Sequence, residues 1–161
     1  MNLHEDYKQL DQLYHQLNQR AEKLYDFILL YNDYIYEERD YGAGAVLKMM
    51  EIHTLTHIED NPGITITALA GHTGKTKGAI SQTVKNLVAK GLVERRRMVG
   101  NSKTVLLHAT DEGIKLSRAH KAYDIADITQ TLQDLQRTCS IEEIDSFYKV
   151  IDAYIALLKE E

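Results

Sequence analysis

The chain has 161 residues, of which 43% are apolar and 27% charged, and its formal net charge is −5. These values predict one globular domain and exclude a disordered chain. The single cysteine, Cys139, excludes an intramolecular disulfide framework, and no apolar run reaches the roughly 18 residues of a membrane span, nor do the first residues form a signal peptide. We therefore expect a cytoplasmic protein without a membrane partner.

A long helix is predicted for residues 3–35, because apolar residues recur there at alternating steps of three and four. That spacing is typical of a helix packed along one seam, and seven of the ten tyrosines lie in the first 41 residues. Such a helix needs a long partner, either another helix of this chain or a second copy. A second helix is expected from about residue 45 to 59, ending at the turn around Pro62.

Two short helices and a hairpin follow. Thr65 opens the first helix, which we expect to stop at Gly71, and Thr76 caps the second, which ends at Gly91. Residues 92–97 and 103–108 are strand-like runs on either side of residues 98–102, whose Gly-Asn sequence favours a β-hairpin.

Two further helices are predicted at the C-terminal end. Thr110 begins a helix that should reach about Gln136, with acidic residues in its first turn. Ser140 and Glu143 form a capping-box pattern for the last helix. The fold class is therefore mainly α with one small β-hairpin.

The charge is distributed unevenly along the chain. Between Thr65 and His108 there are eight lysines and arginines and one acid, Glu94, so this segment carries +7. Since the total is −5, the remaining residues carry −12. A basic segment in an acidic protein is expected where one region meets phosphate, although a merely solvated basic face is the alternative.

Two short helices followed by a hairpin predict a winged helix-turn-helix, with the helix after Thr76 as the recognition element. Its lysines suit phosphates, Ser81 and Gln82 suit base edges, and Gly78 and Ala79 allow close approach. Arginines on the hairpin could reach a neighbouring minor groove. The alternative is a helical domain whose short helices merely pack. The residues expected to contact DNA are Thr67, Lys75, Thr76, Lys77, Gly78, Ala79, Ser81, Gln82, Lys85, Arg95, Arg96, Arg97, Asn101 and Lys103.

Three stretches of sequence, residues 67–70, 76–87 and 90–95, closely resemble the central block of the MarR family of bacterial transcription regulators, and residues 109–113 resemble the turn that usually follows the wing in that family. The resemblance covers about residues 45–118. It implies one MarR-type domain over residues 1–161, which dimerises through helices in residues 1–41 and 112–161. The winged helix-turn-helix would occupy residues 45–110, with the helix-turn-helix at about 65–90 and the wing at 92–109. Two such domains would bind a pseudo-palindromic site on double-stranded DNA.

The wing departs from the family pattern. Members usually carry Asp-x-Arg there, whereas this chain has Asn101-Ser102-Lys103. Lysine keeps the charge but loses the planar fork of arginine. Contact with phosphate therefore remains an expectation, but a supporting Arg–Asp pair does not.

Three histidines and one aspartate are candidate ligands for a metal or a small molecule. His53 and His57 are four residues apart, as are His120 and Asp124. The surrounding residues, 50–55 and 119–123, resemble a branch of the family that represses fatty-acid synthesis genes. His53 and His120 fall near ligand positions of the zinc-responsive branch, which has a histidine where this chain has Asp124. Histidines that support the dimer or a ligand pocket, and a pH switch, are the alternatives.

We expect a DNA-binding transcriptional regulator, a homodimeric repressor of ligand-responsive genes. A winged-helix module that binds protein instead of DNA is one alternative, and a metal-responsive regulator using His53 and His120 is another. The sequence has no nucleophile–base pair, paired-carboxylate motif or cofactor loop, so we do not expect an enzyme. It demands no cofactor, and either a small-molecule effector or a divalent metal would suit the expected response.

Overall fold

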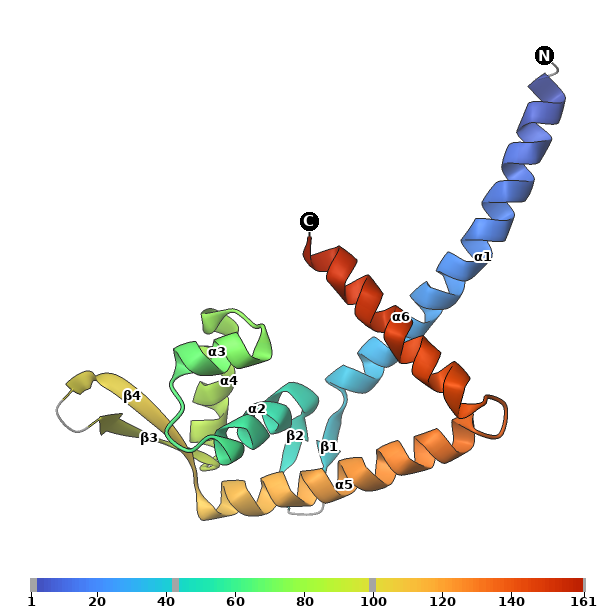
Figure 1. The fold of residues 1–161 in the computed structure, drawn as a ribbon. Helices are drawn as coiled ribbons and strands as arrows, with labels where there is room; N and C mark the ends of the chain where they lie inside the picture. Colours follow the sequence, from blue (N-terminus) through green and yellow to red (C-terminus); the bar gives the residue numbers. More distant parts are fainter. Residues whose placement is uncertain (1–2, 42–43, 99–100, 161) are drawn as a thin grey trace. The chain divides into compact units, whose positions relative to one another are not determined.

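The computed structural model describes the backbone of residues 3–41, 44–98 and 101–160 and the side chains of residues 7–41, 44–97 and 104–160 (Figure 1). The chain divides into two compact units, Met1–Ser117 and Arg118–Glu161. The elements are α1 (Leu3–Tyr36), β1 (Glu38–Asp40), β2 (Val46–Lys48), α2 (Met49–Asp60), α3 (Ile66–Thr73), α4 (Lys77–Ala89), β3 (Val93–Met98), β4 (Asn101–Ala109), α5 (Asp111–Leu135) and α6 (Ile141–Lys159). Within the described ranges, none of the helices combines the length and the hydropathy needed to cross a bilayer.

The core of the first unit lies among α2, α3, α4 and the base of the hairpin. Helix α4 contributes Ile80, Val84 and Leu87, all fully buried and spaced four and three residues apart, as one helix face requires. Among the side chains that the structure describes, the other fully buried apolar ones are Leu47, Ile52, Leu55, Ile58, Leu69, Leu107 and Leu116. This packing fixes one face of α4 and leaves the opposite face in solvent.

The first short helix is longer than the sequence suggests. Gly71 lies inside α3, which continues to Thr73, and the turn uses Gly74 instead, with a φ of 64° in the left-handed region. Glycine adopts this conformation without the penalty that a Cβ brings. The expected stop at Gly71 is therefore wrong, because the chain turns where the left-handed residue is needed, three positions later.

A two-stranded ribbon precedes α2. Strand β2 pairs antiparallel with β1, so the helix that we expect to begin near residue 45 begins at Met49. Leu47 is fully buried while Val46 and Lys48 are exposed, which is the alternation of a strand. The backbone N–H of Lys48 donates to Glu51 Oε2 at 3.4 Å and thereby helps to start α2.

The predicted hairpin is confirmed as β3 and β4. Its register runs from Val93 opposite Ala109 to Arg97 opposite Val105, with an irregularity between Arg97 and Met98. Both strands extend further toward the tip than the sequence suggests, because Met98 pairs with Asn101. The tip residues 99–100 lie outside the described part of the chain.

The base of the hairpin is tied to the segment before α3. Ile64 forms an antiparallel bridge with Leu107, whose backbone N–H donates to Ile64 O at 3.0 Å. The Gly63 N–H donates in turn to Leu107 O at 2.8 Å. Both backbone groups of Leu107 therefore bond to the segment before α3, and the wing is anchored to the helix-turn-helix at this point.

The C-terminal helices begin and end close to the predicted residues. The capping box at the start of α6 is confirmed: Ser140 Oγ accepts from Glu143 N at 3.2 Å, and Ser140 N donates to Glu143 Oε2 at 2.8 Å. Much of the apolar surface of α6 is exposed, including Phe147, Ile155 and Leu158.

Candidate nucleic-acid interface

Helix α4 presents a polar, exposed face opposite its buried one. Lys77, Ser81, Gln82 and Lys85 lie on this face, as do the small residues Gly78 and Ala79. A Cβ built on Gly78 meets no atom within 4 Å. The surface of α4 is therefore open at its N-terminal end, where a groove of DNA or its phosphate backbone could approach closely.

The N-terminus of α4 is held by its cap. Thr76 Oγ1 accepts a hydrogen bond from Ala79 N at 3.2 Å, and Lys75 and Lys77 lie exposed on either side of it. The backbone N–H groups of a helix start and its dipole favour an anion. The two ammonium groups and the helix start thus give one positively charged end to the exposed face.

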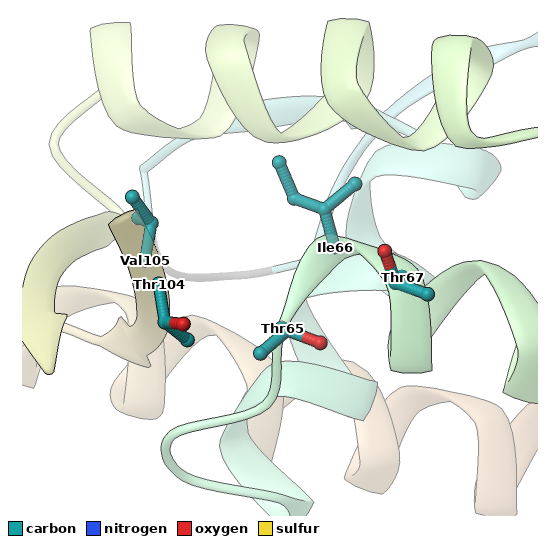
Figure 2. Close-up of a pocket in the computed structure, with 5 residues that line it drawn as sticks. All are labelled: Thr65, Ile66, Thr67, Thr104 and Val105. Atoms are coloured by element: carbon teal, nitrogen blue, oxygen red, sulfur yellow. The ribbon is translucent and has the colours of Figure 1, made fainter. Parts of the chain in front are cut away.

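A hollow of about 330 Å³ lies between the start of α3 and strand β4. Figure 2 shows its lining, with Thr65, Ile66 and Thr67 on the helix side and Thr104 and Val105 on the strand. Thr65 Oγ1 is occupied as the cap of α3, since it accepts from Ala68 N at 3.2 Å. Thr67 is exposed, which leaves this predicted contact residue accessible from outside.

The hairpin carries the remaining positive charge. Arg95, Arg96 and Arg97 are exposed on β3, and the alternation of a strand directs Arg96 to the opposite face from its two neighbours. Arg96 pairs with Glu94, the one acid of the basic segment. Asn101 and Lys103 belong to β4 by their backbone, but their side chains lie outside the described part.

The sequence analysis gave no supporting role to three residues next to the recognition face: Glu51, Asn86 and Lys90. Glu51 is buried, with 8% of its surface exposed, and its Oε2 receives Lys90 Nζ at 2.7 Å. Lys90 also donates to Val46 O at 3.4 Å. Lys90 therefore belongs to the support of α4, although the charge count assigns it to the basic surface.

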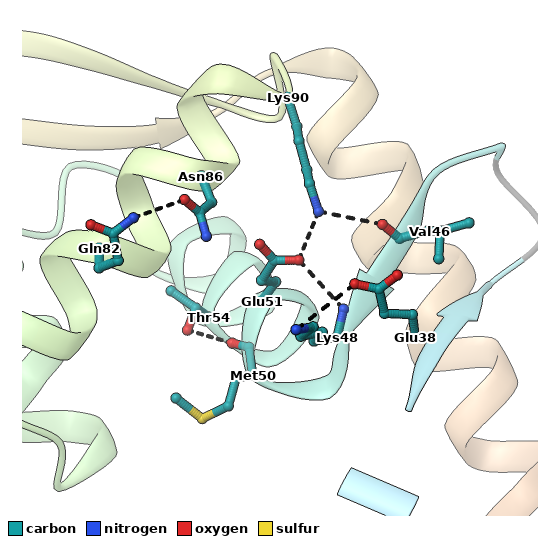
Figure 3. A network of polar contacts seen from close by, with 9 residues as sticks. All are labelled: Glu38, Val46, Lys48, Met50, Glu51, Thr54, Gln82, Asn86 and Lys90. Carbon is teal, nitrogen blue, oxygen red and sulfur yellow. Dashed lines mark hydrogen bonds and ion pairs between the residues drawn. The ribbon is translucent and has the colours of Figure 1, made fainter. Parts of the chain in front are cut away.

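The amide of Asn86 lies between this support and Gln82 on the exposed face (Figure 3). Gln82 Nε2 donates to Asn86 Oδ1 at 3.1 Å, and the amide nitrogen of Asn86 is directed toward Glu51, where it helps to lower the pKa of that carboxyl group. The spacing of four residues between Gln82 and Asn86 could have indicated this pair from the sequence. The burial of Glu51 could not, because it depends on α2 packing against α4.

Burial alone would raise the pKa of Glu51. The hydrogen bond and positive charge of Lys90, the N–H of Lys48 and the Asn86 side chain outweigh that effect, so the pKa of Glu51 lies below its usual value. Glu51 is therefore a carboxylate at neutral pH and acts only as a hydrogen-bond acceptor.

The candidate ligand residues belong to two elements. His53 is exposed and His57 half-buried on α2, in the first unit. His120 is buried on α5, in the second unit, and its Nδ1 lies 3.2 Å from Asp124 Oδ1. The spacing of four residues therefore brings one imidazole and one carboxylate together, as predicted for this pair.

Comparison with known proteins gives consistent matches. Residues 47–100 match the model of the MarR family. A helix-turn-helix transcriptional regulator of Bacillus subtilis, YhjH, is 30% identical over 125 residues, which cover 76% of this chain and 71% of YhjH.

Two of the solved structures that share the fold serve as examples. FabT of Streptococcus pneumoniae in complex with DNA has a TM-score of 0.62 at 23% identity and covers 91% of this chain and 98% of its own. The zinc-responsive MarR family member ZitR of Lactococcus lactis has a TM-score of 0.64 at 20% identity and covers 89% of this chain and 97% of its own.

Proposed function

This chain belongs to the MarR family of DNA-binding transcriptional regulators, and on that premise we propose that it is a homodimeric repressor that reads duplex DNA with α4 in the major groove and the β3–β4 wing at the minor groove. The observation that carries this proposal is the exposed face of α4, positively charged at its start and lined by Ser81 and Gln82. Lysines there would contact phosphate, whereas hydroxyl and amide groups would contact base edges.

The terminal helices supply the proposed dimer interface, within residues 1–41 and 112–161. The predicted seam of α1 is largely exposed, with Leu10 and Leu17 at about 60% and Tyr7 at 61%. Exposed apolar faces of this length mark interaction surfaces. A two-fold dimer would present two α4 helices, and half-sites one helical turn apart require a separation of about 34–36 Å.

A ligand would regulate such a dimer by favouring one separation of the two recognition helices over another. The effector that we propose is either a small molecule or a divalent metal. His120 and Asp124 favour the metal, because a buried imidazole beside a carboxylate is a common pair of ligands, with His53 and His57 as further candidates. As a regulator of transcription, the protein would act in the cytoplasm.

The test begins with a duplex selected from a random library by the wild-type protein and titrated by fluorescence anisotropy at several salt concentrations. Each phosphate contact should add about −0.9 to the slope of log affinity against log salt. Arg96→Ala should weaken binding to all DNA sequences alike. It should also make the slope shallower by about 1.8 per dimer, since each protomer loses one phosphate contact. Gln82→Ala should instead relax sequence preference and leave the slope unchanged.

The matched control is Lys48→Ala, which removes an exposed cation that also faces an acid, Glu38 at 3.9 Å, but lies on the β1–β2 ribbon. We expect it to leave both slope and preference unchanged. Binding that does not depend on salt, or equal behaviour of Arg96→Ala and Gln82→Ala, would contradict the proposed roles. A protein that bound no duplex at low salt would favour the protein-interaction module.

A further inference from the structure

A row of polar side chains leads from the interior of the first unit to the recognition face. It starts at the buried Glu51 on α2, passes through Asn86 and ends at the exposed Gln82 on α4. Figure 3 shows the Asn86 nitrogen directed toward Glu51, and the Gln82 oxygen directed away from Asn86. The row therefore leads from a buried charge to a side chain that we assign to base contact.

The charge of Glu51 favours one orientation of both amides. A carboxylate attracts a donor and repels a carbonyl oxygen, so Asn86 keeps its NH₂ group on the side of Glu51 and its Oδ1 toward Gln82, as Figure 3 shows. Oδ1 accepts only, so Gln82 must turn its own NH₂ toward Asn86 at 3.1 Å. The alternative orientation of either amide would place two acceptors, or two donors, against each other. The outward atom of Gln82 is therefore its carbonyl oxygen.

We propose that Glu51 and Asn86 are positioning residues for base selection, which hold Gln82 with Oε1 toward the major groove so that it selects a base pair with an amine at that position. This inference rests on the proposed function of α4. The donors available in the major groove are the N6 amine of adenine and the N4 amine of cytosine. Guanine and thymine place a carbonyl at the equivalent position, which would face Oε1 with a second acceptor.

Lys90 makes the arrangement stable without taking part in it. Its ammonium group, 2.7 Å from Glu51 Oε2, compensates the buried charge, and its second bond to Val46 O ties it to the β1–β2 ribbon. A buried carboxylate without this partner would tend to take up a proton. A protonated Glu51 could donate as well as accept, and the direction of the Asn86 and Gln82 bonds would no longer be fixed.

The experiment compares base pairs that differ by one exchange of amine for carbonyl. In the selected duplex, the position whose preference Gln82→Ala abolishes is changed from adenine to guanine, or from cytosine to thymine, with the complementary change opposite. Wild-type protein should prefer the amine-bearing pair about tenfold, within the range for one base contact. Asn86→Ala and Glu51→Gln should reduce this ratio to about threefold or less, because Gln82 can then turn either way.

The same variants should keep the wild-type affinity for an unrelated duplex and the wild-type salt slope, a result that a general loss of structure would not give. Asn61→Ala is the matched control: its exposed amide donates to His57 O at 2.9 Å at the other end of α2, so it should keep the wild-type ratio. Asn86 is exposed and its replacement leaves the Glu51–Lys90 pair intact, so Asn86→Ala tests the proposal even if Glu51→Gln does not fold.

Two results would overturn the inference while the proposed function stands. One is that both Asn86→Ala and Glu51→Gln keep the wild-type preference for the amine-bearing over the carbonyl-bearing pair. The other is a preference of wild-type protein for the carbonyl-bearing pair at the position that depends on Gln82. The absence of any salt-dependent DNA binding by wild-type protein would remove the proposed function and this inference together.

Discussion

Gly113, in the first turn of α5, is the glycine of the described residues at which one added methyl group should be most destabilising. A Cβ there would lie 2.1 Å from the carbonyl oxygen of Leu92 and 3.2 Å from Leu55 Cδ1. Real Cβ contacts essentially never fall below 3.0 Å, so the Leu92 carbonyl would have to retreat by about 1 Å. That carbonyl accepts from Thr110 N at 3.1 Å, so the retreat would also break the bond that ties Leu92, just before β3, to Thr110, just before α5.

The expected cost of Gly113→Ala follows from these contacts. Overpacking a tight site costs about 1–3 kcal/mol, and a lost hydrogen bond about 1 kcal/mol. Replacing glycine by alanine in a helix stabilises the fold by about 1 kcal/mol through the higher helix propensity of alanine. The free energy of unfolding should therefore fall by about 2 kcal/mol, equivalent to a decrease of roughly 4–8 °C in Tm for a chain of this size.

Gly71→Ala is the matched control, since Gly71 is a helical glycine whose added Cβ would meet nothing within 4 Å. It should raise the free energy of unfolding by up to about 1 kcal/mol. Urea unfolding followed by circular dichroism, at one protein concentration for all variants, measures both changes. If Gly113→Ala were as stable as wild type, the close approach of Leu92 to α5 would not exist as described, and the reasoning would fail.

Three further predictions concern other parts of the chain. The folded state lowers the pKa of Glu51 below the usual value of 4.5, so the charge of Glu51 stabilises the fold above that pH and this stabilisation is lost as the pH falls further. Urea unfolding at pH 7 and pH 3.5 should therefore show a smaller decrease in the free energy of unfolding for Glu51→Gln than for wild type. Thr76→Ala should cost about 1 kcal/mol through loss of the α4 cap, and Thr76→Ser should keep most of it, as urea unfolding will show. Elemental analysis of purified protein, with DNA binding measured with and without chelator, should find one metal per chain and chelator-sensitive binding if His120 and Asp124 hold a regulatory ion; metal-free protein with unchanged binding would reject that site.

The order of helices and the hairpin could be predicted from the sequence because these elements carry local signals. The apolar spacing of Ile80, Val84 and Leu87 marks the buried face of α4, and Thr76 marks its start. The ribbon of β1 and β2 could not be predicted, because three-residue strands show only a single alternation. Val46–Lys48 therefore resembles the first turn of the helix that follows it.

The exposed part of the recognition face follows from the same helical spacing, but its support does not. Lys90 contributes to the basic segment in the sequence, whereas in the structure it serves Glu51, 39 positions away. A contact between residues so far apart in the sequence depends on how α2 packs against α4. The apolar spacing within either helix does not predict that packing. The same reason applies to Gly113: only glycine fits there, because the carbonyl of Leu92 occupies the space that a Cβ would need.

The anchoring of the wing at Leu107 has a consequence for how the protein behaves at high concentration. Beyond that residue, the two-stranded hairpin has no further strand paired to its edges among the residues described, and exposed sheet edges are templates for pairing with another chain. Arg95, Arg96 and Arg97 lie along β3, where like charges would repel the same strand of a second molecule. We therefore expect these arginines to oppose edge-to-edge association of the free protein, and we expect a variant that neutralises all three to abolish DNA contact to be more prone to it.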